Sequence, residues 1–218
     1  MDKRQEMLQK RAEKLKQEQE RVWQMGEYER SYANYAHICG IDEVGRGPLA
    51  GPVVAGAVIL PRDCEILYIN DSKKLTPKRR EALYEEIMEK AAATGLGMIS
   101  PARIDEINIL QATYEAMRMA IDNLQVKPDL LLNDAVTIPG VMIEQVAIIK
   151  GDAKSISIAA ASIIAKVTRD RLMAEYDQII PGYEFAKNSG YGTANHIKAL
   201  KELGASPIHR RSFIKKFV

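Results

Sequence analysis

The chain has 218 residues, of which 46% are hydrophobic and 28% charged, so it can bury one well-formed core with a small appendage. Its net charge of +2 is too small to indicate a nucleic-acid partner, and Cys39 and Cys64 lack the spacing of a disulfide framework or zinc site. A charged N-terminus and the lack of any run of about eighteen apolar residues exclude a signal peptide and a membrane span, so we expect a cytoplasmic protein.

The first segment, from residue 2 to about residue 30, is predicted to be a charged helix. It contains eight Lys or Arg and seven Asp or Glu, with no proline and no glycine before Gly26. Leu8, Leu15 and Val22 recur every seven residues and form a narrow apolar stripe, typical of a helix that docks lightly or pairs with a partner. We expect residues 1–35 to be a solvated accessory extension and residues 36–218 to form the main domain.

Two short segments rich in β-branched residues follow, and both are predicted to be strands. They span residues 37–41 and 53–60 and are bounded by glycine and proline. The glycine-rich connection from Gly45 to Pro52 is short, which favours an antiparallel pair.

Strands and helices alternate after this hairpin. Thr76 and Pro77 are typical of a helix N-cap and first helical position, so a helix is expected to about residue 93. Further strands are expected at 95–100, 130–132 and 145–149, and further helices at 108–124, 155–180 and 195–203. This order predicts an α/β fold with a mixed five-stranded sheet, helices on both faces and functional sites at strand ends.

Acidic residues interrupt three otherwise apolar elements. Asp42 and Glu43 follow the first strand, Asp134 follows the fourth strand after one asparagine, and Asp170 lies in the Ala-rich helix. Buried carboxylates are costly unless they are paired or bind a cation. If the first and fourth strands are neighbours and the Ala-rich helix crosses them, these acids converge, and their oxygen ligands would select Mg²⁺ or Mn²⁺.

A carboxylate cluster beside a basic surface suits phosphodiester hydrolysis by two metal ions about 4 Å apart. The basic surface is expected at the C-terminal end. Residues 186–218 carry seven Lys or Arg and one acid, so this segment has a net charge of +6 and the rest of the chain −4.

Each acid taken singly also has a structural interpretation. Asp42 could cap a turn, Asp134 could be a turn residue, and Asp170 could pair with Lys166 four residues earlier. Neighbouring residues of a flat strand face opposite sides, so Asp42 and Glu43 share a site only if the strand twists or ends there.

Five motifs, in this order, resemble those of the ribonuclease HII family, the type 2 ribonucleases H. They are IDEVGRGPLAGP at 41–52, DSKKL at 71–75, SIAAASIIAKVTRD at 157–170, SGYGT at 189–193 and HRRSF at 209–213. Together they extend over nearly the whole main domain, and five spaced motifs are far more specific than any one alone. The resemblance implies a ribonuclease H-like fold with a C-terminal helical segment.

The resemblance also implies which acids bind metal and act in catalysis, and they are the four that the residue pattern indicates: Asp42, Glu43, Asp134 and Asp170. Two neighbours depart from the family pattern. Asn133 stands where the family usually has an aliphatic residue, and Ala135 stands where many members have glycine.

Substrate-binding residues follow from the same resemblance. Gly45, Arg46 and Gly47 would contact the ribose 2′-hydroxyl and the neighbouring phosphate, which suits glycine because it lets the backbone approach a sugar closely. Lys73 would contact a phosphate. Tyr191 would stack on the sugar after the ribonucleotide and detect the RNA-to-DNA junction.

The resemblance implies an endoribonuclease that cuts on the 5′ side of ribonucleotides, in RNA–DNA hybrids or in duplex DNA, and leaves 3′-hydroxyl and 5′-phosphate ends. Four basic residues near the C-terminus are expected to track the duplex backbone: Lys198, Lys201, Arg210 and Arg211. We expect a monomer without a protein-partner motif. Two alternatives stay open: another ribonuclease H-superfamily nuclease, such as a transposase or resolvase, and a non-catalytic nucleic-acid-binding protein.

Overall fold

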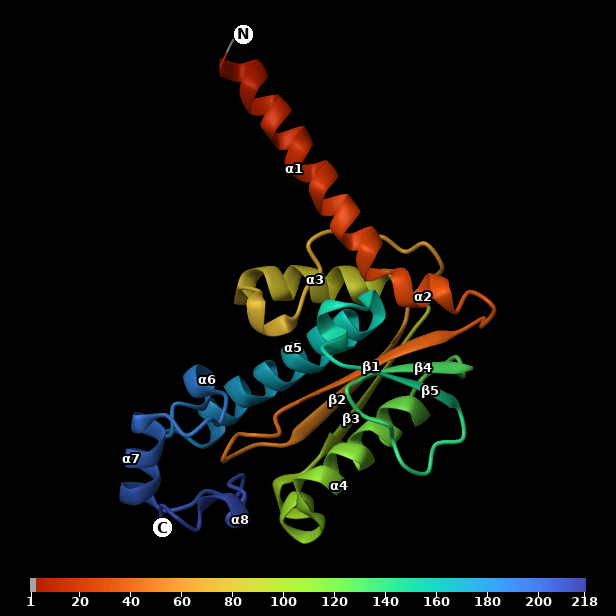
Figure 1. Ribbon diagram of the computed structural model, residues 1–218. Coiled ribbons are helices and arrows are strands. Elements are labelled where there is room, and N and C mark those ends of the chain that lie inside the picture. The colour runs from red at the N-terminus through yellow and green to blue at the C-terminus, as the bar shows by residue number, and fades with distance from the viewer. Residues whose placement is uncertain (1–2) are drawn as a thin grey trace.

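The computed structural model describes residues 3–218 and contains one five-stranded sheet in the order β3-β2-β1-β4-β5 (Figure 1). The strands are β1 (Ile38–Val44), β2 (Val53–Ile59), β3 (Ala93–Ile99), β4 (Leu130–Asp134) and β5 (Glu144–Ile148). β1 pairs antiparallel with β2 and parallel with β4, while β2–β3 is antiparallel and β4–β5 parallel. The predicted mixed α/β sheet is therefore confirmed.

Helices cover both faces of this sheet. The helices of the described residues are α1 (Lys3–Met25), α2 (Glu27–Ser31), α3 (Pro77–Lys90), α4 (Pro101–Asp122), α5 (Ile156–Ile179), α6 (Phe185–Asn188), α7 (Ala194–Leu203) and α8 (Arg211–Ile214), with short 3₁₀ turns η1 (Ser72–Lys74) and η2 (Gly151–Ala153). α4 packs on β2 and β3 from one side, whereas α5, backed by α3, packs on β1 and β2 from the other (Figure 1). No helix between residues 3 and 218 is both long and apolar enough to cross a membrane.

Two glycines bring α5 directly onto the sheet. A Cβ atom at Gly40 would lie 2.1 Å from the carbonyl carbon of Ser157, and one at Gly56 would lie 2.5 Å from the carbonyl oxygen of Ala161. Such distances are far inside van der Waals contact, so neither position admits a side chain unless the backbone moves. This close packing fixes the height and direction of α5 above β1.

α4 begins seven residues earlier than predicted. Ser100 caps the helix by accepting a hydrogen bond from the Arg103 N–H, and Pro101 occupies its first turn. Asn108 breaks it, with φ 68° and ψ 164°, and then restarts it, because its side-chain oxygen accepts from the N–H groups of Leu110 and Gln111. The apolar periodicity from residue 109 belongs to the second part alone.

The predicted N-terminal helix is present, and most of it projects away from the rest of the molecule (Figure 1). Its last turns do not. Val22 and Met25 are 4% and 5% exposed and belong to a core cluster with residues of α3 and α5. Trp23 faces outward, is 61% exposed, and carries the Arg30 guanidinium 4.0 Å above its ring.

α2 is also attached to the main domain. The Glu29 carboxylate accepts hydrogen bonds from the Ser157 N–H at 3.0 Å and from the hydroxyls of Ser155 and Ser157, at the first turn of α5. Arg21 of α1 donates to the Ile69 carbonyl at 2.6 Å. We therefore place the end of the accessory segment within α1 instead of at residue 35.

Candidate active site

Asp42 and Asp134 lie side by side on adjacent parallel strands. The register pairs Ile41 with Asn133, so the next residue of each strand is at the same level of the sheet. Asp42 is 6% exposed. Burial raises the pKa of its carboxyl well above the usual range, and the charges of Glu43 and Asp134 raise it further.

Glu43 belongs to the same acid cluster, although β1 continues through Val44 and does not end at residue 43. Burial raises the pKa of the Glu43 carboxyl, and the nearby Asp134 charge adds to this rise. Arg46 opposes it, with Nη1 lying 3.3 Å from Glu43 Oε1, and Lys73 opposes it from a greater distance. Three of the four predicted acids thus lie together.

Asp134 ends β4, and its side chain is fixed by the chain segment after β5. Its Oδ1 accepts a hydrogen bond from the Gly151 N–H at 2.7 Å. The preceding Asn133 is fully buried and donates to Gln145 Oε1 at 2.8 Å, and Gln145 in turn accepts from the Ile138 N–H. The departure from an aliphatic residue at Asn133 therefore serves to hold the loop between β4 and β5.

Asp152 is an acid of the site that the sequence analysis missed. It lies in η2, directly after the Gly151 N–H that binds Asp134. Burial raises the pKa of Asp152, the charges of Asp71 and Asp134 raise it further, and Lys73 is among the cations that oppose them. The available signal was its place just after a strand parallel to β4, because the carboxyl ends of parallel strands meet at one edge of the sheet.

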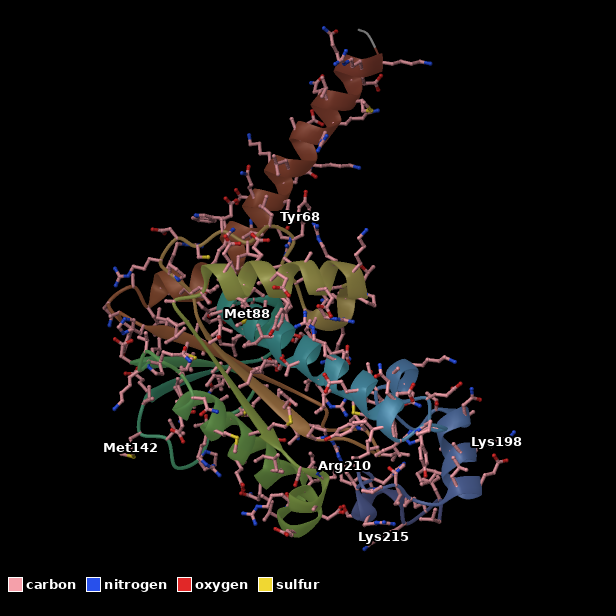
Figure 2. The ribbon with its side chains drawn as sticks, turned by 180° about the vertical axis from the view of Figure 1, so that it is seen from behind. Tyr68, Met88, Met142, Lys198, Arg210 and Lys215 are labelled. Atoms are coloured by element: carbon pink, nitrogen blue, oxygen red, sulfur yellow. The ribbon has the colours of Figure 1, made fainter. Side chains whose placement is uncertain are left out.

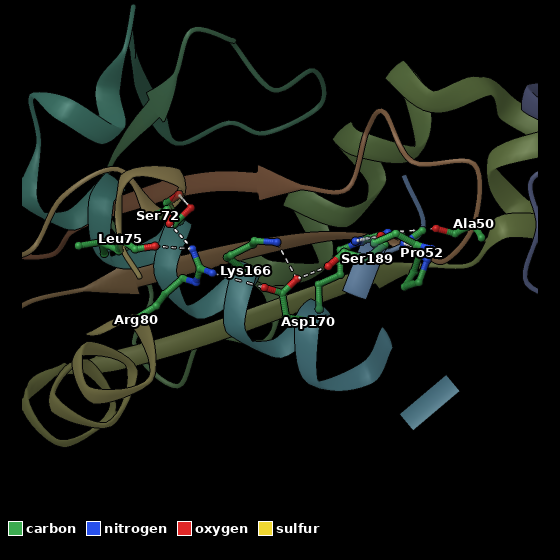
Figure 3. Close-up of polar contacts among 12 residues, drawn as sticks. Ala50, Pro52, Ser72, Leu75, Arg80, Lys166, Asp170 and Ser189 are labelled. Atoms are coloured by element: carbon green, nitrogen blue, oxygen red, sulfur yellow. Dashed lines mark hydrogen bonds and ion pairs between the residues drawn. The ribbon is translucent and has the colours of Figure 1, made fainter. Parts of the chain in front are cut away.

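Asp170 is not brought to this cluster. The Ser162 side chain on α5 forms a hydrogen bond with Asp42. Asp170 lies eight residues beyond Ser162, which is about 12 Å along the helix axis. Its carboxylate is within 2.6 Å of Lys166 Nζ and 3.8 Å of Arg80 Nη2, and it accepts a hydrogen bond from the Ser189 hydroxyl (Figure 3). The structural alternative, an ion pair with Lys166, is what the structure contains.

Lys73 is held over the acid cluster by η1. Asp71 caps this turn by accepting from the Lys73 N–H at 2.9 Å, and the Ser162 hydroxyl of α5 donates to Ser72. Burial would lower the pKa of Lys73, but the charges of Asp42 and other nearby acids outweigh burial and raise it. A cation is therefore fixed beside the carboxylates without being bonded to one of them.

The donor set fits a hard divalent cation. Carboxylate oxygens are its preferred ligands, and the raised pKa values of Asp42, Glu43 and Asp152 mean that the protein's own cations do not neutralise them. Over residues 3–218, no group of three or more His, Cys, Asp or Glu side chains is arranged so that it could hold a metal ion by itself. Mg²⁺ usually keeps several waters and binds through only one or two carboxylates.

The glycine-rich loop after β1 lies against the loop that carries Tyr191. Gly45 has a φ of +90°, and a Cβ atom at Gly47 would lie 3.7 Å from Tyr191 Cε1. The Tyr191 side chain is 45% exposed, and the Arg46 side chain is exposed to the same extent. The structure therefore brings Arg46, Gly47 and Tyr191 into one exposed surface, with Gly45 buried next to it.

Two buried histidines support the Tyr191 loop. The Ser206 N–H donates to His209 Nδ1, so the proton of neutral His209 is on Nε2, which lies 3.0 Å from His196 Nε2. His196 then carries its proton on Nδ1 and donates to the Tyr191 carbonyl at 2.8 Å. The hydrogen-bond pattern assigns both tautomers and links Tyr191 to the start of the C-terminal segment.

The prediction that Arg210 contacts the backbone of a nucleic-acid duplex is wrong. Arg210 is fully buried, lying between the glycine-rich loop and the C-terminal elements, so it cannot reach a phosphate on the surface (Figure 2). Lys198 projects outward from α7, with a side chain 73% exposed, and Lys201 and Arg211 are also exposed. Charge counting cannot separate Arg210 from these three because burial depends on contacts far away in the sequence.

Comparisons with known proteins agree with this geometry. The family model described as Ribonuclease HII matches residues 39–216. The chain is 75% identical over 205 residues to ribonuclease HII of Lachnoclostridium phytofermentans, covering 94% of this chain and 81% of the relative. It is 56% identical over 210 residues to ribonuclease HII of Enterococcus faecalis, covering 94% and 82%. The crystal structure of ribonuclease H2 from Pyrococcus horikoshii matches with a TM-score of 0.67 and 30% identity, over 83% of this chain and 96% of that one.

Proposed function

Because this chain belongs to the ribonuclease HII family and is therefore a ribonuclease H type 2 endonuclease, we propose that it cuts on the 5′ side of ribonucleotides. Its substrates would be RNA–DNA hybrids and duplex DNA containing single ribonucleotides. Family membership removes the two alternatives, a transposase-like or resolvase-like nuclease and a non-catalytic binding protein. A monomer suffices for this proposal, because the acids and the two loops that carry Gly47 and Tyr191 come from one chain.

The observation that carries the site assignment is a group of four carboxylates near enough to affect one another's pKa, with Lys73 beside them. We assign Asp42, Glu43, Asp134 and Asp152 to a site for divalent cations, Mg²⁺ or Mn²⁺, and leave Asp170 out of it. Bound metal would supply an activated water and stabilise the leaving oxygen. Lys73 would hold the phosphate beside the acids, because its ammonium is a point charge that binds phosphate without fixed geometry.

The surface formed by Arg46, Gly47 and Tyr191, with the buried Gly45 beside it, is proposed to recognise the ribonucleotide. A 2′-hydroxyl both donates and accepts hydrogen bonds, and it is the group by which a protein distinguishes RNA from DNA. The Tyr191 ring, beside Gly47, would pack against the next sugar only where that sugar lacks the hydroxyl. Exposed Lys198, Lys201 and Arg211 would contact phosphates and set affinity more than specificity.

Cleavage of matched duplexes tests this function. Three substrates of one sequence are compared at one salt and one metal concentration: all-DNA, DNA with a single ribonucleotide, and a long hybrid. We expect cleavage of the last two alone, at the 5′ side of a ribonucleotide. Tyr191→Ala should lower cleavage at the single ribonucleotide much more than within the hybrid. Equal losses on both would assign Tyr191 to general binding or loop packing.

A further inference from the structure

Two buried guanidinium groups lie beneath the ribonucleotide-recognising surface. Arg169 of α5 and Arg210 are the two largest fully buried side chains among the described residues, and both are 0% exposed. Burial lowers the pKa of Arg169, and it lowers that of Arg210 to about 9, with the Arg169 charge adding to the fall. Arginine keeps its proton in proteins, so both groups are charged at neutral pH.

Backbone carbonyls are the hydrogen-bond acceptors of both groups, and within residues 3–218 neither forms an ion pair with a carboxylate. Arg169 donates to the carbonyls of Pro52 at 2.9 Å, Ala50 at 3.1 Å and Ser189 at 2.8 Å. Arg210 donates to those of Gly51 at 3.0 Å, Arg46 at 2.9 Å and Gly45 at 2.5 Å. The two arginines thus collect six carbonyls from two loops, 45–52 and 189–191. Such an arrangement needs the planar five-donor fork of arginine.

The inward direction of the carbonyls in loop 45–52 determines which backbone groups this loop exposes on its outer side. In a trans peptide the C=O of one residue and the N–H of the next point in opposite directions. With the carbonyls of Gly45 and Arg46 directed at Arg210, the N–H groups of Arg46 and Gly47 are directed away from it. Across the described chain, neither N–H donates to a protein acceptor.

Glycine at position 45 makes this arrangement possible. A Cβ atom there would lie 2.3 Å from Arg169 Nε, and the φ of +90° is one that other residues rarely adopt. The loop can therefore rest directly on the buried guanidinium. Arg169 also holds the Ser189 carbonyl, two residues before Tyr191, so one side chain links both halves of the surface.

We infer that Arg169 and Arg210 are positioning residues for ribonucleotide recognition: they turn the carbonyls of loop 45–52 inward and leave a surface of free N–H donors. Two buried positive charges beneath these donors also favour a phosphate or an electron-rich oxygen above them. Neither arginine touches the substrate. This inference rests on the proposed role of Gly45, Arg46, Gly47 and Tyr191, and it adds the residues that give that surface its polarity.

Conservative substitution tests the inference. Arg210→Lys and Arg169→Lys keep the charge, but a single ammonium cannot hold three carbonyls in the fork geometry. The measured quantity is the ratio of dissociation constants for a single-ribonucleotide duplex and an all-DNA duplex of the same sequence. All proteins carry Asp42→Asn so that no strand is cut. Arg171→Lys, an exposed position two residues along α5, is the matched control.

We expect each buried substitution to reduce the discrimination ratio about tenfold, the effect of one lost hydrogen bond of about 1.4 kcal/mol, with affinity for all-DNA duplex unchanged. The control should leave the ratio intact. An unchanged ratio in folded Arg210→Lys and Arg169→Lys would overturn the positioning role and reduce both residues to structural supports. If the protein with both arginines intact binds the single-ribonucleotide and all-DNA duplexes equally well, the proposed recognition of the 2′-hydroxyl is wrong instead.

A second measurement needs no arginine variant and so does not depend on its folding. Amide hydrogen exchange at Arg46 and Gly47 should be fast in the free protein and should slow when the single-ribonucleotide duplex binds. The all-DNA duplex should slow it much less. Equal protection by both duplexes, or slow exchange in the free protein, would contradict an outward row of free donors.

Discussion

The buried pair His196 and His209 is expected to make the fold lose stability as the pH falls. Protonating His209 places a hydrogen on Nδ1, where the Ser206 N–H already donates. Protonating His196 sets two N–H groups against each other across 3.0 Å. Either event breaks the chain of hydrogen bonds that ends at the Tyr191 carbonyl.

The size of this effect follows from the His209 pKa. Burial, together with the charges of His196 and Arg211, lowers it to about 4, while an exposed histidine in the unfolded chain titrates near 6.5. The folded-state pKa is thus depressed. The stability is fully present above about pH 6.5 and is lost as the pH falls toward 4, because the unfolded chain binds the proton more readily. Between pH 7.5 and 4.5 the loss comes to about 2 to 3 kcal/mol.

Urea unfolding at pH 7.5, 6.0 and 4.5 measures this loss when the unsubstituted protein is compared with His209→Gln. The raised pKa values of Asp42, Glu43 and Asp152 act with the opposite sign, since they add stability as the pH falls. They are common to both proteins and cancel in the difference. The stability advantage of the unsubstituted protein should therefore shrink toward pH 4.5. A gap that is constant with pH would refute the assignment of a neutral, proton-excluding His209.

Other predictions concern the acids, the packing of α5 and the N-terminal helix. Asp152→Asn should lower cleavage by about a hundredfold or more at an unchanged or higher melting temperature, because the fold disfavours the charged form of this carboxyl. Asp170→Asn should keep metal-dependent cleavage, and the reverse pattern in matched assays would exchange the two roles. Gly40→Ala should lower the free energy of unfolding, measured with urea, by about 1–3 kcal/mol or more, because its Cβ would lie 2.1 Å from a backbone atom of α5. An unchanged free energy of unfolding would mean that α5 can move away from the sheet at no cost. A chain beginning at Gln17 should melt and cleave like the full chain. A chain beginning at Ser31 should melt at a lower temperature, because it lacks the buried end of α1 and the Glu29 carboxylate that bonds to the first turn of α5. Equal melting temperatures of the two truncated chains would show that this docking does not stabilise the fold.

Sequence patterns predicted the sheet and three acids because both depend on local rules. Alternation and turn residues define the strands, and the parallel pairing of β1 with β4 then brings Asp42 beside Asp134. Asp152 was not predicted, because it lies in a short polar turn, where no surrounding apolar residues distinguish a functional acid from a solvated one. Its position depends on how the chain returns after β5.

The structure pairs Asp170 with two cations and buries Arg210, whereas the sequence analysis placed them at a metal site and on the duplex backbone. Asp170 follows an apolar stretch, as a ligand would, but its cationic partner Arg80 comes from α3, ninety positions earlier in the chain. Arg210 lies in a basic segment, yet its acceptors are carbonyls of residues 45, 46 and 51. The sequence allowed the pairing of Asp170 with Lys166, but local composition carries no information about Arg80 or about the carbonyls that Arg210 binds. Only the assembled fold could separate these roles.

The single tryptophan of the chain, Trp23, determines what optical measurements on this protein report. It lies at the junction of α1 and α2, largely exposed and stacked by Arg30. Its fluorescence will therefore report the attachment of the N-terminal helix and will change little when substrate binds at the carboxylates. Denaturation followed by tryptophan emission and by circular dichroism would give different midpoints if α1 detaches first. Such a disagreement would indicate local release of the helix, with the sheet still intact.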